Sequence, residues 1–278
     1  MITRYEPLPP GVTGLPSPLR MEAVIGDVPC LQFGDDVLCD AAEGVRSAAL
    51  RAVAREPGAV DRTNGAEPLY HVYRNVRPAL LADAMNRYGF SYALTAFKAG
   101  TIGGGAEWVR TRGHTNSDAP GTNLSYPEIH EVLRGEAWLY LQHGTTDRPT
   151  DAVTIPLAAG DKAVVAPGWA SLLANVGAGE LIVGTWRMAD CETERTALAA
   201  FGGMAHFVLR SENGEPFCAP NAHYKDAPAP RIAQPKELPD WGLTHAEPLL
   251  AAFHRSPEYL RCLLRPQDFA DVWRTLYD

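Results

Sequence analysis

The sequence contains no long apolar run, and this absence argues against a membrane-spanning protein. No stretch approaches the roughly 18 consecutive apolar residues that indicate a transmembrane helix. The N-terminal stretch MITRYEPLPPGVTGLP also lacks the apolar core of a secretory signal peptide. We therefore expect a cytoplasmic protein that has no membrane partner.

Paired cysteines and an excess of positive charge are also missing. The five cysteines are odd in number and scattered, and no two form a CxxC pair. This pattern argues against a zinc ribbon and against a disulfide framework. The formal net charge of −8 argues against nucleic acids and anionic membranes as partners, although a local basic pocket for a small anion is compatible with it.

Apolar residues are present in the amount that a globular core requires. They make up 46% of the 278 residues, and charged residues make up 21%. These proportions are typical of a soluble globular protein. The length accommodates one large or two small domains.

Proline and turn residues divide the chain into three regions. Residues 1–225 hold the strand-like segments, residues 226–243 are rich in proline and predict an extended linker, and residues 244–278 predict a helical extension. Within the first region, residues 1–20 contain five prolines and two glycines and predict an irregular arm. In the last region we expect three helices. The first spans about residues 245–254, the second begins at Pro257, and the third spans about residues 267–277.

Short apolar segments recur over residues 69–209, and turn residues separate them. Before them, a helix is predicted from Asp40 to about Glu56, with Pro57-Gly58 at its end. Many short strands at close spacing, without alternating helices, predict an antiparallel sandwich or barrel. The segments are LYHVY, SYALTAF, EWVR, EIHEVL, AWLYLQ, AVTIPL, KAVVA, ELIVGTW and HFVLR.

The segment YPEIHEVLRG carries polar residues inside one of these predicted strands. Because side chains of a strand alternate between its two faces, Glu128 and His130 share one face, and Ile129 and Glu131 share the other. A carboxylate and an imidazole on one face indicate either a half-exposed strand or a functional site. We expect Glu131 to be a surface or interface residue.

Two segments combine polar residues and glycines at fixed spacing. The first contains Gly113-His114-Thr115-Asn116, then Glu128 and, after six further residues, Gly135; the second runs from Gly160 through Pro167 and Ser171 to Asn175. They resemble the two signature motifs of the cupins, small β-barrels that usually bind a divalent metal. The resemblance implies an all-β fold with helical additions: a cupin-type antiparallel β-barrel, or jelly roll, followed by short C-terminal helices.

Further segments extend this resemblance over about residues 69–224, where the chain resembles the cupin-type glucose-6-phosphate isomerases. They are LYHVY at residues 69–73, TRGH at 111–114, LRG at 133–135, APGWA at 166–170, SENGE at 211–215 and NAHY at 221–224.

The isomerases bind their metal through two histidines of the first motif, a glutamate and a histidine of the second motif. Here His114 and Glu128 remain, whereas Asn116 and Ser171 occupy the other two positions. An amide and a hydroxyl are poor ligands for a transition metal. We therefore expect either no metal or a weakly bound divalent one (Fe, Mn, Zn or Ni) at His114 and Glu128.

The resemblance also implies residues that bind the substrate. In the isomerases a sugar phosphate is held by a threonine on an early strand and by a T-x-G sequence before the first ligand, and Thr95 and Thr111-Arg112-Gly113 match these positions. Hydroxyls, a glycine amide and a guanidinium suit an oxyanion. Further candidates for substrate contact are Tyr70, Tyr73, Asn116, Ser171 and Trp138, the last of which is expected to fill barrel volume or narrow the cavity.

The function expected from these residues is acid/base chemistry on a small polar or anionic metabolite. Glu128 and His130 are the expected catalytic residues and His114 a positioning residue, for an isomerisation, elimination or cyclisation in specialised metabolism. One alternative is a metal-dependent glucose-6-phosphate isomerase with a metal site rebuilt from His114, Glu128 and His130. Another is a non-catalytic ligand-binding cupin, in which these residues are structural. We expect a homodimer.

Overall fold

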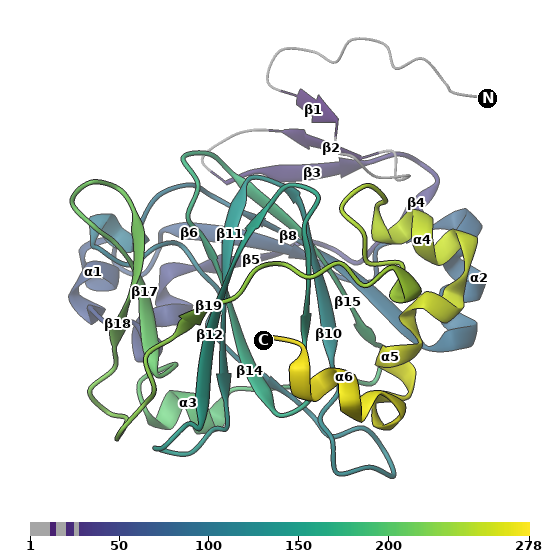
Figure 1. The fold of residues 1–278 in the computed structure, drawn as a ribbon. Coiled ribbons are helices and arrows are strands. Elements are labelled where there is room, and N and C mark those ends of the chain that lie inside the picture. Colours follow the sequence, from purple (N-terminus) through teal and green to yellow (C-terminus); the bar gives the residue numbers. More distant parts are fainter. Residues whose placement is uncertain (1–11, 15–20, 25–27) are drawn as a thin grey trace.

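The computed structural model describes residues 12–14, 21–24 and 28–278 (Figure 1). Two β-sheets pack face to face around an apolar interior and form the antiparallel barrel that the sequence predicts. Short helices lie outside the barrel, and the C-terminal ones cover one of the two sheets (Figure 1). No helix among the described residues is long and apolar enough to cross a membrane.

The larger sheet has six strands in the order β13-β10-β15-β8-β6-β5. Every neighbouring pair is antiparallel. The strands are β5 (Glu43–Arg46), β6 (Pro68–Tyr73), β8 (Phe90–Phe97), β10 (Glu128–Arg134), β13 (Lys162–Val165) and β15 (Leu181–Met188).

The smaller sheet has four strands in the order β14-β11-β12-β19. They are β11 (Glu136–His143), β12 (Asp151–Ala158), β14 (Trp169–Asn175) and β19 (Arg231–Ile232), of which β19 alone pairs in parallel. Gly135 connects β10 of one sheet to β11 of the other at a φ of +86°. A side chain there would place its Cβ 2.4 Å from the Glu180 carbonyl oxygen, so this corner requires glycine.

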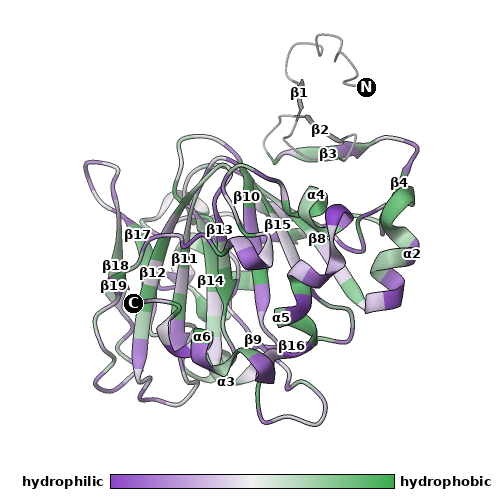
Figure 2. Cartoon of the chain, turned by 45° about the vertical axis from the view of Figure 1, so that its right-hand side comes forward, coloured by the Kyte–Doolittle hydropathy of each residue, from purple (hydrophilic) through white to green (hydrophobic). Residues whose placement is uncertain are grey.

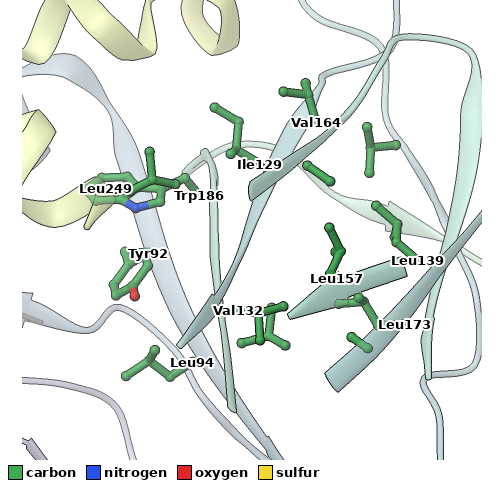
Figure 3. Close-up of a cluster of buried hydrophobic side chains, with 14 of the residues drawn as sticks. Tyr92, Leu94, Ile129, Val132, Leu139, Leu157, Val164, Leu173, Trp186 and Leu249 are labelled. Atoms are coloured by element: carbon green, nitrogen blue, oxygen red, sulfur yellow. The ribbon is translucent and has the colours of Figure 1, made fainter. Parts of the chain in front are cut away.

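Alternation along the strands produces two apolar layers (Figure 3). Inside the barrel, apolar side chains from both sheets meet, including Val132, Leu139 and Leu173. On the outer face of the six-stranded sheet, Trp186 is fully buried and contacts the C-terminal extension. Burial of large apolar side chains on both faces explains why these strands are almost continuously hydrophobic.

The remaining strands form small sheets at the edges of the barrel. β1 (Val12–Gly14), β2 (Met21–Val24) and β3 (Cys30–Phe33) make a three-stranded sheet at one end of the molecule (Figure 1). The two-stranded pairs are β4 (Val37–Leu38) with β7 (Arg77–Pro78), β9 (Thr115–Asn116) with β16 (Thr193–Glu194), and β17 (His206–Arg210) with β18 (Pro216–Pro220).

The helices are short. The α-helices are α1 (Pro57–Arg62), α2 (Ala79–Tyr88), α3 (Thr196–Ala200), α4 (Leu249–Arg255), α5 (Arg261–Leu264) and α6 (Ala270–Thr275). The 3-10 helices span Ser47–Val53, Ile102–Gly104, Pro239–Trp241, Pro257–Leu260 and Pro266–Phe269.

Two sequence-based predictions of secondary structure are wrong. The helix expected from Asp40 to Glu56 is replaced by β5 and a 3-10 turn, because Glu43–Arg46 pairs with β6 at the edge of the sheet. Pro57 begins α1 instead of ending a helix, in the first-turn position that proline favours. The segment EWVR is no strand and makes only isolated bridges. Most of the predicted arm at residues 1–20 lies outside the described residues.

The C-terminal extension packs on the barrel of its own chain. Phe253 of α4 lies with its ring centroid 5.1 Å from that of Trp186. The Tyr277 hydroxyl donates to the Val164 carbonyl and accepts from the Ala166 amide. Helices α4 and α5 lie over the six-stranded sheet (Figure 2), and the linker joins the edge of the other sheet as β19, which pairs with β12.

This packing corrects the expected position of Glu131. Its side chain does point away from the barrel interior, but it is buried beneath the extension, with 3% of the residue exposed. The carboxylate accepts the Leu249 amide at 3.1 Å and lies 3.3 Å from Nζ of Lys162. The outer face of this strand is therefore not exposed to solvent, because the helical extension covers it.

Candidate functional site

A pocket opens between the two sheets. Its lining includes Glu128 and His130 of β10, Thr185 of β15 and Ser171 of β14. The cavity has a volume of about 120 Å³. Since one water needs roughly 10–15 Å³ of such space, there is room for on the order of ten waters, which suits a small molecule and not a polymer.

Glu128 is the centre of the polar groups in this pocket. Its carboxylate is 1% exposed, and its Oε1 lies 3.1 Å from Nε2 of His130 and 3.2 Å from Nε2 of His114. The Ser171 hydroxyl donates to the same oxygen at 2.9 Å. The structure therefore brings together four residues that the sequence places on β10, on β14 and in the segment before β9.

The two histidines differ in their second ring nitrogen. Nδ1 of His130 lies 2.9 Å from the Thr185 hydroxyl, so both nitrogens of this ring are engaged. Nδ1 of His114 has no hydrogen-bond partner among the described residues, and this side chain is 17% exposed. In the neutral imidazole, a carboxylate that faces Nε2 favours the tautomer with the proton on that nitrogen, and Nδ1 of His114 is then an acceptor.

The electrostatic environment keeps Glu128 ionised. Burial raises the pKa of its carboxyl group, but His114 and His130 lower it by more, through their charge and their hydrogen bonds. The pKa of Glu128 therefore lies well below its ordinary value. A buried carboxylate in contact with two imidazoles is a candidate functional group.

Four arginines line the same pocket of a chain whose net charge is negative. Arg74 pairs with Glu43 at 2.7 Å at the exposed end. No carboxylate of the described residues forms an ion pair with the other three, which are Arg112, Arg187 and Arg195. Partial burial lowers the pKa of Arg195, and the neighbouring arginines lower it further. Unpaired cations in a half-buried pocket attract an anionic ligand.

The predicted oxyanion-binding residues all line this pocket. They are Thr95, Thr111, Arg112 and Gly113. Gly113 has a φ of +81°, and a Cβ there would lie 2.9 Å from the Met204 side chain. Thr111 also accepts the Leu173 amide through its hydroxyl at 3.1 Å, which fixes its rotamer toward β14.

The sequence profile of glucose-6-phosphate isomerase (GPI) matches residues 44–226. This range includes every strand that lines the pocket and both motifs. The chain belongs to the glucose-6-phosphate isomerase family. No curated protein matches it in sequence.

Solved structures similar to this family member include two larger proteins. Vicilin from Capsicum annuum shares 11% identity over 45% of this chain and 30% of its own, with a TM-score of 0.33. Bacillus subtilis oxalate decarboxylase, described through its Mn(II) centres, shares 18% identity over 44% of this chain and 26% of its own, with a TM-score of 0.31. The chain thus spans less than a third of either protein.

The four-ligand metal site of the cupin-type isomerases does not fit the residues present. Asn116 directs its Nδ2 to the Tyr126 carbonyl at 2.9 Å and is absent from the pocket lining. Ser171 donates its proton to Glu128 and so acts as a hydrogen-bond donor. Within the described part of the chain, no group of three or more His, Cys, Asp or Glu side chains has a geometry suited to a metal ion.

Three of the predicted substrate contacts lie outside the pocket. Tyr70 lines the pocket, but Tyr73 lies three residues later and therefore faces the other side of β6, where its hydroxyl accepts the Leu31 amide. Trp138 lies on the outer face of β11, in a separate groove with Trp108. Asn116 is turned toward the Tyr126 carbonyl. The predictions for Tyr73, Trp138 and Asn116 are corrected accordingly.

The sequence analysis missed six polar residues that line the pocket, which are Glu43, Arg74, Thr185, Arg187, Thr193 and Arg195. Thr185 and Arg187 lie on β15, where the alternation in GTWRM is the signal that could have identified them as facing inward. Arg195 lies between β16 and α3. These residues add two of the three unpaired cations.

Proposed function

We propose that the pocket binds a small anionic metabolite and catalyses proton transfer on it without the metal of the isomerases. The observation that carries this proposal is the contact of one buried, ionised carboxylate, Glu128, with two imidazoles and a hydroxyl. Acid/base catalysis needs titratable groups with opposed protonation in one dry site, and this arrangement supports it.

The roles we propose follow from the hydrogen bonds. Glu128 orients His114, whose free Nδ1 is the acceptor for a substrate proton. His130 exchanges a proton with Glu128, and Thr185 fixes its ring. His114 thus takes the part of base that the sequence suggested for His130, because both nitrogens of His130 already have partners.

The substrate class is supported by charge and by family membership. Arg112 and Arg195 line the pocket together with Tyr70, and both lower the pKa of its phenol, which burial raises. An anionic group bound there, with Thr95 and Thr111, leaves the rest of a small molecule near Glu128. An isomerisation, in which a proton moves between neighbouring carbons next to a carbonyl, agrees with the activity that gives the family its name.

The second candidate is a metal-dependent glucose-6-phosphate isomerase, and the family match favours it. In this candidate His114, Glu128 and His130 would hold the metal. Metal analysis of protein purified without chelator, combined with an isomerase assay on glucose 6-phosphate, separates the two. Our proposal predicts far less than one metal per chain and no stimulation by added Fe, Mn, Zn or Ni. Metal near one per chain, with turnover that chelation abolishes, would establish the second candidate.

A further inference from the structure

Arg187 lies at the end of the pocket where Glu128 is found. Strands β10 and β15 pair Ile129 with Trp186, so the next position along both strands holds Glu128 and Arg187. Both side chains line the pocket, and opposite residues on one face of a sheet have Cβ atoms about 4.5–5.5 Å apart.

The charge of Arg187 has no protein partner. Within the described residues its side chain makes no hydrogen bond and no ion pair. Burial raises the pKa of the nearby Cys191 thiol to about 12, while Arg187 lowers it and Glu128 raises it. Both charges therefore act on the same small region.

The other unpaired arginines come from other elements. Arg112 lies in the segment before β9, and Arg195 lies between β16 and α3. Both line the same pocket as Arg187. Of the three, Arg187 alone is on a strand adjacent to β10, directly opposite Glu128 in the register of β10 and β15.

The proposed reaction creates negative charge at the reacting end. When a base removes a proton from the carbon next to a carbonyl, the C–H electron pair forms a C=C bond and the carbonyl π pair moves to oxygen. When the proton is returned to the former carbonyl carbon, the hydroxyl proton of the deprotonated carbon moves to the enolate oxygen and a new carbonyl forms on that carbon, so no further reactant is consumed. A fixed cation within hydrogen-bond distance of that oxygen stabilises the transition state.

We propose that Arg187 is a catalytic residue that binds this oxygen and supplies the positive charge that the incomplete metal ligand set does not. This inference rests on the proposed function. It also explains why an arginine stands unpaired beside a carboxylate that is already satisfied by His114, His130 and Ser171.

Two probes that differ only at the reacting end test this role without the natural substrate. Arabinonate 5-phosphate carries a carboxylate where arabinitol 5-phosphate carries a neutral hydroxymethyl group. By calorimetry, the wild type should bind the acid at least about tenfold more tightly than the alcohol, as for a charged hydrogen bond. Arg187→Gln should abolish this preference while leaving the affinity for the alcohol within about twofold, which also shows that the pocket is folded.

Two further variants serve as controls. Arg187→Lys, which keeps the charge, should retain part of the preference, and Arg195→Gln should weaken both probes equally. Equal affinities in the wild type, no binding of either probe, or an unchanged preference in Arg187→Gln would overturn the inference. A failure of the proposed function would appear separately, as a reaction rate that does not depend on Glu128.

Discussion

His130 and Thr185 face each other across strands β10 and β15, and Nδ1 of the imidazole lies 2.9 Å from the threonine hydroxyl. This contact leaves Nε2 of the ring to face Glu128 at 3.1 Å. The hydroxyl therefore fixes which nitrogen of His130 faces the carboxylate. In the mechanism that we propose, Thr185 is a positioning residue, because it acts on the site through His130.

Replacement of Thr185 by Val should slow the reaction by about tenfold, as expected when an orienting hydrogen bond is lost. Thr185→Ser, which restores the hydroxyl, should recover most of the rate. The pH–rate profile provides a second readout, since the loss of an orienting hydrogen bond to the acid/base groups should shift it. A rate lost equally in both variants, with an unchanged profile, would indicate that Thr185 only fills space.

His206 provides a test of stability against pH. Burial lowers the pKa of His206 to about 4, and its Nδ1 lies 2.9 Å from the Tyr140 hydroxyl. The unfolded chain therefore binds a proton below about pH 6.5 that the folded chain takes up only near pH 4. Stability should be complete above pH 6.5 and fall as the pH drops toward 4, by up to about 3 kcal/mol.

His206→Gln is the matched control for this dependence, since an amide keeps a hydrogen-bond acceptor but does not titrate. Urea unfolding at a series of pH values should give wild-type and variant curves that approach each other as the pH falls from 7 to 4. Parallel curves over this range would show that His206 is not the group responsible.

Lys162 joins the C-terminal extension to the barrel. Its ammonium lies 3.3 Å from Glu131 and donates to the Thr244 carbonyl at 2.6 Å. Burial raises the pKa of Glu131, and Lys162 lowers it. Lys162→Met leaves a buried carboxylate without its partner and should destabilise the protein by about 3–5 kcal/mol in urea unfolding.

The double variant Glu131→Gln with Lys162→Met should recover much of that loss, because no uncompensated charge then remains and the amide still accepts the Leu249 amide proton. If the double variant is less stable than Lys162→Met alone, the ion pair is not what holds the extension.

The sequence predicted the barrel and its pocket because both have local signals. Alternating short segments indicate the strands, and the spacing from Glu128 to Gly135 places the carboxylate before the corner that only glycine can form. The resemblance to the cupin-type isomerases then pointed to Thr95, Thr111, Arg112 and Gly113, which line the pocket. The contact of His130 with Glu128 could be predicted, because alternation along a strand places both residues on the same face.

The errors concern residues whose position depends on which face of a strand they occupy, or on which distant strands pair with each other. Tyr73 was a candidate for substrate contact together with Tyr70. Two residues that are three positions apart on a strand point to opposite faces, so Tyr73 points away from the pocket. Trp138 has the opposite parity to Leu139, which faces the interior with Leu173. Arg187 acquires its place only through the pairing of β15 with β10, and such pairing between distant segments has no local signal.

The central claim is that Glu128 drives proton transfer in the absence of a metal. Proton NMR in D₂O can follow exchange at the carbon next to the carbonyl of fructose 6-phosphate and of a panel of small keto phosphates and keto acids, with chelator present. The wild type should catalyse exchange on at least one of them, and Glu128→Gln should lower that rate by about 10²–10⁴-fold. Glu136→Gln, at an exposed carboxylate of β11, should leave it unchanged. No exchange by the wild type under chelation, or an equal rate in Glu128→Gln, would contradict the account.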